Sequence, residues 1–103
     1  MTKTEAIQAK LAEIKAEMQT TGAWDIVAPA PEAYENMGAF GMNTMAYEQW
    51  LRHVFVPSVE SRFADDGPWP PSSSVGTQAI REFDGVPQNA RLTTLLCEFD
   101  RLF

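Results

Sequence analysis

The chain has 103 residues, of which 45% are apolar, and it carries a net charge of −6. This length predicts one domain over residues 1–103 with its own hydrophobic core, and the apolar fraction excludes a disordered acidic tail. Direct nucleic-acid binding is disfavoured, because it needs clustered basic side chains and the eight present are scattered among acidic neighbours.

Cysteine usage and the lack of long apolar runs indicate the compartment. The single Cys97 cannot form an internal disulfide, which fits a reducing environment. No run approaches the roughly 20 apolar residues that span a bilayer, and the first ten residues, MTKTEAIQAK, have no apolar signal region. We therefore expect a cytoplasmic protein without a membrane-spanning segment.

Residues 3–21 have the pattern of an amphipathic helix. Thr2 and Glu5 are spaced as in a capping box, in which two side chains bond the free N–H groups of the first turn. Gly22 is placed to end the helix. One apolar stripe follows the helical period, and its members are Ile7, Leu11, Ile14 and Met18.

Residues 22–45 have no sustained period and contain two prolines and three glycines. A connection of this length is uncommon in a compact domain. Its many aromatic and aliphatic residues, among them Trp24, Phe40 and Met42, are too apolar to lie in water. We expect an ordered loop that wraps across the helices.

A second helix is predicted from near Thr44 to about Asp66. A proline inside a helix removes a hydrogen bond and clashes with the preceding turn, so Pro57 predicts a kink. Val56 falls off the apolar face, and we expect it to be exposed beside that kink. The polar face includes His53. The apolar face comprises Tyr47, Trp50, Leu51, Val54, Phe55, Val59 and Phe63.

Two shorter helices complete the predicted fold. After the rigid connector at 67–71, the serines at 72–74 offer N-caps for a helix that carries Val75, Ala79, Ile80 and Phe83. The last helix repeats leucine and phenylalanine from Leu92 to the final residue. No alternating strand pattern is present, so the fold class is all-α: a small four-helix bundle with a long ordered loop between helices one and two.

The stretch GAFGMNTMAYEQWLRHVFVPSV at 38–59 resembles the signature of the YqcC-like family of small bacterial proteins. Asn43 stands where that family usually has aspartate, and Ser58-Val59 replaces its Arg-Met pair, which puts any contact of that arginine in doubt. The resemblance extends from about residue 7 to residue 102. The matching motif residues are Phe40, Thr44, Met45, Gln49, Trp50, Leu51, Phe55, Val56 and Pro57.

The resemblance carries its own implications. The family is one of small helical bundles with no attributed catalytic activity. Its genes often lie beside that of a tRNA uridine pseudouridine synthase, which implies an accessory role in tRNA modification. From the resemblance we expect a pseudouridine synthase as protein partner, with Phe40, Asn43, Thr44, Trp50, Leu51 and Phe55 as the structural motif.

The side chains that could carry out catalysis or bind a metal do not form a recognisable motif in the sequence. His53 is expected to be a solvated surface residue, and Cys97 a small buried hydrophobe. The acidic pair Asp65-Asp66 lacks the ligand spacing of a calcium loop and reads as a solvated helix end. We therefore expect no metal, no cofactor and no catalytic set. Trp50 is expected in the core.

Two functions remain open from the sequence. The first is a non-catalytic accessory protein that contacts its partner through Val56, Pro57 and Trp69. Trp69 lies between prolines and is either an exposed anchor or a plug for the bundle end. The second function is a small ligand-binding or enzymatic bundle with a pocket under the 22–45 loop. A net charge of −6 favours a basic protein partner over nucleic acid or anionic membrane.

Overall fold

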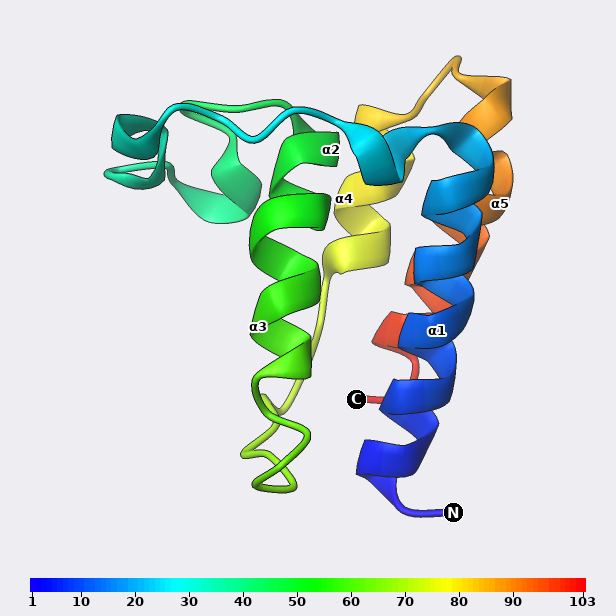
Figure 1. The fold of residues 1–103 in the computed structure, drawn as a ribbon. Coiled ribbons are helices and arrows are strands. Elements are labelled where there is room, and N and C mark those ends of the chain that lie inside the picture. Colours follow the sequence, from blue (N-terminus) through cyan, green and yellow to red (C-terminus); the bar gives the residue numbers. More distant parts are fainter.

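The computed structural model describes residues 1–103, and it contains helices and no strand. α2, the π-helical segment and α3 follow one another without a break and form a single rod, so the predicted all-α fold of four helices is confirmed (Figure 1). None of the helices is long and apolar enough to cross a membrane. The main elements are α1 (Lys3–Thr21), α2 (Tyr47–Trp50), the π-helical segment Leu51–Phe55, α3 (Val56–Glu60), α4 (Val75–Glu82) and α5 (Ala90–Asp100).

Helix α1 has the predicted bounds and caps. The Glu5 amide donates to Thr2 Oγ1 at 3.1 Å, and the Thr2 amide donates to Glu5 Oε1 at 3.0 Å. Gly22 follows the helix with φ of 88°, a left-handed conformation that suits glycine. All four residues of the predicted stripe are buried, and α1 packs through them against the core that includes α5.

The connection between α1 and α2 contains three short 3-10 helices, Ala23–Asp25, Pro31–Tyr34 and Ala39–Gly41. It crosses one end of the bundle and then projects beside α2, on the side away from α1 (Figure 1). The second helix begins at Tyr47 rather than near Thr44. The Thr44 hydroxyl donates to the Ala33 carbonyl inside this connection, so it does not cap the helix.

The helix continues through Pro57, which lies in α3, and the irregularity of the rod is a π-helical turn at Leu51–Phe55. The Val56 amide bonds to the Leu51 carbonyl, five residues back, and the backbone at both residues stays helical. Such a turn holds one residue more than an α-helical turn. It lies immediately before the proline, which has no N–H to donate.

Val56 is only 1% exposed, so the prediction that it lies on the surface is wrong. An α-helix advances about 100° per residue, and one extra residue rotates everything after it by that amount relative to a regular helix. The rotation turns Val56 into the core. It also keeps every fourth residue on the buried face, namely Tyr47, Leu51, Phe55 and Val59.

The N-terminus of α4 is capped from α5 and not by the predicted serines. Ser74 occupies the N-cap position without a side-chain bond. Asp100 Oδ1 accepts from the Val75 amide at 3.0 Å and from Ser73 Oγ at 2.6 Å. Its Oδ2 accepts from the Gly76 amide at 2.8 Å. The negative charge of this carboxylate also interacts favourably with the dipole of α4 at the helix N-terminus.

We expect Asp100→Ala to lower the free energy of unfolding by about 1–3 kcal/mol, because it leaves two amides of α4 unbonded and removes a charge from the helix start. Urea denaturation followed by circular dichroism measures this loss. Asp84→Ala is the control, because Asp84 is exposed and makes no hydrogen bond. Equal stability of the two variants would show that Asp100 is not a cap.

Candidate functional site

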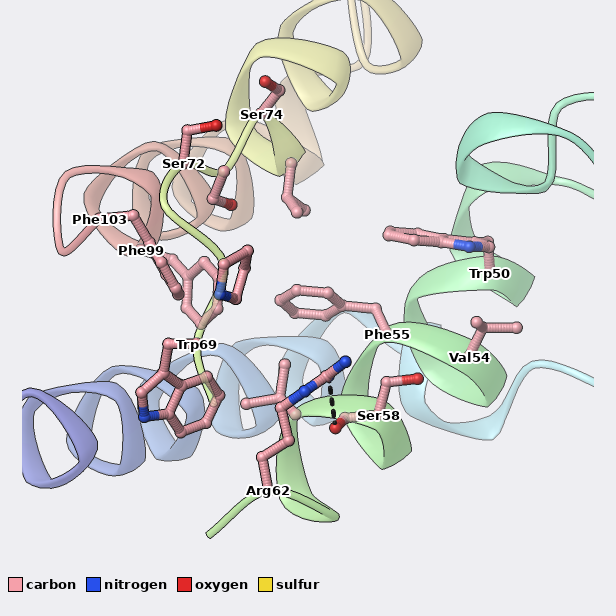
Figure 2. Close-up of a pocket in the computed structure, with 14 residues that line it drawn as sticks. Trp50, Val54, Phe55, Ser58, Arg62, Trp69, Ser72, Ser74, Phe99 and Phe103 are labelled. Carbon is pink, nitrogen blue, oxygen red and sulfur yellow. Dashed lines mark hydrogen bonds between the residues drawn. The ribbon is translucent and has the colours of Figure 1, made fainter. Parts of the chain in front are cut away.

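An apolar groove of about 250 Å³ runs between the α2–α3 rod and the connector that leads into α4 (Figure 2). Residues of the rod form one wall, the connector at 69–75 forms the other, and α5 with the C-terminal residue completes the lining. The lining residues are Trp50, Val54, Phe55, Ser58, Val59, Arg62, Trp69, Pro70, Ser72, Ser73, Ser74, Val75, Phe99 and Phe103.

Aromatic rings in edge and tilted contact make the floor of the groove. The Phe55 ring points from the rod toward Phe99, and their centroids are 5.1 Å apart (Figure 2). The Phe99 and Phe103 centroids are also 5.1 Å apart, and those of Trp50 and Phe55 are 5.7 Å apart. Offset and edge contacts of this kind stabilise aromatic clusters, so the floor is held firmly from two helices.

Trp69 closes one end of the groove. Its Nε1 donates to Thr4 Oγ1 on α1 at 2.8 Å, and the Thr4 hydroxyl donates in turn to Asp66. Its ring lies between those of Phe63 and Phe103, at centroid distances of 6.1 and 6.4 Å. The half-buried Trp69 therefore both seals the bundle end and presents one side to the groove.

Arg62 is the one charged residue of the lining. Its side chain is exposed, its Nη1 donates to the Ser58 carbonyl at 3.1 Å, and it takes part in none of the three ion pairs of the protein. No side chain of the lining is a carboxylate, thiol or imidazole that could serve as a general base. The groove therefore combines an apolar, largely aromatic lining with one cationic side chain at its edge.

The other predicted contact residues do not join this groove. Val56 is buried in the core, and Pro57 is exposed but lies outside the lining. Trp50, predicted as core, is half-buried and forms part of the groove wall against the core. Leu51 is fully buried.

The loop part of the sequence motif holds the connection against the rod. The Phe40 ring stands edge-on to Trp50, with centroids 5.2 Å apart, and near Tyr47. Phe40 adopts φ of 56°, which is rare for a bulky residue and is fixed here by those contacts. Asn43 Nδ2 donates to the Asn36 carbonyl at 3.3 Å and ties the loop to itself.

The polar side of the rod anchors the start of the connection, which the sequence did not indicate. Arg52 Nε donates to the Trp24 carbonyl at 2.9 Å, and its guanidinium lies 3.7 Å from the Trp24 ring centroid. His53, expected to be solvated, is half-buried, and its Nε2 donates to the Ile26 carbonyl at 2.9 Å. Gln49 bonds the Val27 carbonyl in the same way. His53 is therefore a structural donor in this protein.

Neither Cys97 nor Tyr47 lines the groove. Cys97 is half-buried on α5, where its backbone faces Gly76. The Tyr47 hydroxyl donates to the Val75 carbonyl at 2.7 Å, and burial raises the pKa of that phenol far above its ordinary value. Two other hollows are present: one of about 370 Å³ lies between the end of α4 and the start of α5, and a polar one of about 260 Å³, with Asp25 and Glu48 in its lining, lies where the 22–45 connection starts.

Comparison with known proteins identifies the family. A protein of Haemophilus influenzae described as uncharacterized is 27% identical over 81 residues, which is 76% of each chain. A tRNA pseudouridine synthase C of Pectobacterium carotovorum is 28% identical over 61 residues, which cover 59% of this chain but only 16% of that protein. No solved structure matches. The sequence model of one family matches residues 6–102, and the chain therefore belongs to the family described as tRNA pseudouridine synthase C, which confirms the resemblance found at residues 38–59.

Proposed function

We propose that this chain is a non-catalytic accessory protein that binds a tRNA pseudouridine synthase. One observation carries the proposal: a segment similar to this chain makes up 16% of a protein named tRNA pseudouridine synthase C. The greater part of that protein has no counterpart in the 103 residues here. We infer that this segment is a module of that protein, and a module joined to a synthase in one protein is suited to bind a synthase when it is a separate chain.

Charge supports the same pairing. The chain has fourteen acidic residues, and only Glu13, Glu60 and Glu98 take part in ion pairs. An enzyme that grips tRNA needs basic surface for the phosphates. The unpaired carboxylates would steer such an enzyme toward this chain, while they repel tRNA.

The chemistry of the groove favours binding over catalysis. Its lining has one cation, several hydroxyls and an aromatic floor, but no side chain that could move a proton at neutral pH. We infer that the synthase supplies the catalytic residues and that this chain supplies a contact surface.

Co-purification tests the proposal directly. The tagged chain is expected to retain the pseudouridine synthase of the same organism at low salt. The complex should weaken as ionic strength rises past about 0.15 M, where charges more than about 8 Å apart are screened. Isothermal titration calorimetry on the two purified proteins measures the dissociation constant at each salt concentration.

The isolated chain serves as its own control with tRNA. In a gel-shift assay we expect no binding at concentrations that saturate the synthase, and in a pseudouridine assay we expect no product from this chain alone. Tight binding of the chain to tRNA, or no complex with the synthase at micromolar concentrations, would overturn the proposal.

A further inference from the structure

We propose that the groove binds a segment of the synthase in which a large apolar side chain stands next to a carboxylate. The apolar side chain would lie on the aromatic floor, and the carboxylate would pair with Arg62. This inference rests on the proposed function and names the surface through which it acts.

The size of the groove favours a protein segment over a free small molecule. Small-molecule sites usually enclose roughly 300–1,000 Å³ and bury most of their ligand. This groove has about 250 Å³ and is bounded by two separate chain segments, the rod and the connector (Figure 2). It has room for an anchoring side chain while the backbone that carries it passes outside. Aromatic anchors in such pockets provide most of the binding energy of many interfaces.

The positive charge of Arg62 indicates that the residue next to the apolar anchor is acidic. Arg62 lies just beyond α3 without an ion-pair partner, in a protein whose net charge is −6. A guanidinium has five N–H donors, and Arg62 uses one of its nitrogens for the Ser58 carbonyl. The remaining donors can hold a carboxylate in the two-bond geometry that arginine favours. A basic side chain at this point would be repelled, so a basic synthase fits here only through an acidic residue.

The opposite wall can bond the backbone of the segment. Ser72 and Ser74 are exposed, and neither side chain is used in a hydrogen bond within the protein. Figure 2 shows Ser72 and Ser74 on the connector side, across the groove from the rod, with the Ser74 hydroxyl turned away from the rod. A segment that lies along the groove would therefore meet a cation on one side and a neutral serine-bearing connector on the other.

The test compares two charge reversals. Arg62→Glu is expected to weaken synthase binding by about tenfold or more, as at other central interface positions. Arg81→Glu is the matched control: Arg81 is exposed near the far end of α4, outside the groove lining, and its reversal changes the net charge by the same amount. Any change in long-range steering is then common to both variants, and the difference between them reports the local contact.

A second variant tests the edge of the groove on the rod. Val54 is half-buried and lines the groove, and Val54→Asp places a charge at the rim beside the apolar anchor. We expect a similar loss of binding, with an unchanged circular dichroism spectrum. A photo-crosslinking residue in place of Ser58, which also lines the groove, should form a bond to the synthase, and the same residue in place of the exposed Thr77 should not.

The outcomes separate the two proposals. If the unchanged chain binds the synthase and Arg62→Glu binds as well as Arg81→Glu, the groove is not the contact and the proposed function stands. If the unchanged chain does not bind the synthase, both proposals fail. A homodimer that Arg62→Glu dissociates in sedimentation runs, or a small molecule that native mass spectrometry finds in the purified chain and loses in Val54→Asp, would also overturn the groove assignment.

Discussion

Val56→Asp is expected to cost about 3–5 kcal/mol of folding free energy, the loss measured when a buried charge has no partner. Val56 is 1% exposed and belongs to the core cluster. A domain of this size has roughly 5–15 kcal/mol of total stability, so the variant should be largely unfolded or should melt far below the unchanged protein. Thermal melts followed by circular dichroism measure the effect.

Val54→Asp is the control, two residues earlier on the same rod. Val54 is half-buried at the edge of the groove, where water can reach a carboxylate. We expect a loss of about 1 kcal/mol or less, as for most surface substitutions. If Val56→Asp were tolerated as well as Val54→Asp, the rod would be a regular helix with Val56 on its surface, and Val56 would again be a candidate for the partner contact.

The comparison of α1 with the rod shows that sequence periodicity predicts a regular helix well and an irregular helix poorly. In α1 the capping box, the four-residue apolar stripe and the terminal glycine all agree with one regular helix, and the structure has each of them. In the rod, the angle of about 100° per residue that holds for an α-helix does not hold through residues 51–55, where the chain forms a π turn. The apolar residues were recognised, but their direction after the turn was not.

The apolar repeat itself held the signal for the π turn. Tyr47, Leu51, Phe55 and Val59 recur at intervals of four, and a regular helix would carry such a series about 40° further around its axis at each step. In a regular helix this series would spread over about 120° of the surface, the full width of a broad apolar face. One extra residue near the middle restores the alignment, and Pro57 marks the place where a missing N–H makes this easy.

The groove was not predicted from the sequence, which placed a possible pocket under the 22–45 loop and offered only Trp69 of the lining as a contact residue. Trp50, Phe55 and Trp69 each stand out in the sequence as large apolar side chains, yet no pattern says that the connector at 69–75 lies beside the rod. The roles of Gln49, Arg52 and His53 were hidden for a related reason: a polar side chain that bonds a distant loop has the same sequence position as one that faces water. Both facts depend on contacts between segments far apart in the chain.

Gly76→Ala is expected to lower the free energy of unfolding by about 1–3 kcal/mol, the usual cost of forcing extra atoms into a packed contact. A Cβ on Gly76 would lie 2.5 Å from both the Cα and the amide nitrogen of Cys97, and 2.7 Å from the carbonyl carbon of Leu96. These are backbone atoms of α5, so no side chain can rotate away. α4 and α5 would have to separate, and the Asp100 bonds to the start of α4 would lengthen with them.

The sign of the stability change in Gly76→Ala shows whether the close contact with α5 or the higher helix propensity of alanine has the larger effect. In an exposed helix, replacing glycine by alanine stabilises by about 1 kcal/mol, because alanine is the best helix former. Thr77→Ala, at the next and exposed position of α4, should show a small gain of this kind. Gly76→Val should be worse than Gly76→Ala, because the larger side chain deepens the clash. Urea denaturation of the three variants gives the ranking, and a gain in stability for Gly76→Ala would mean that α4 does not pack directly on the α5 backbone.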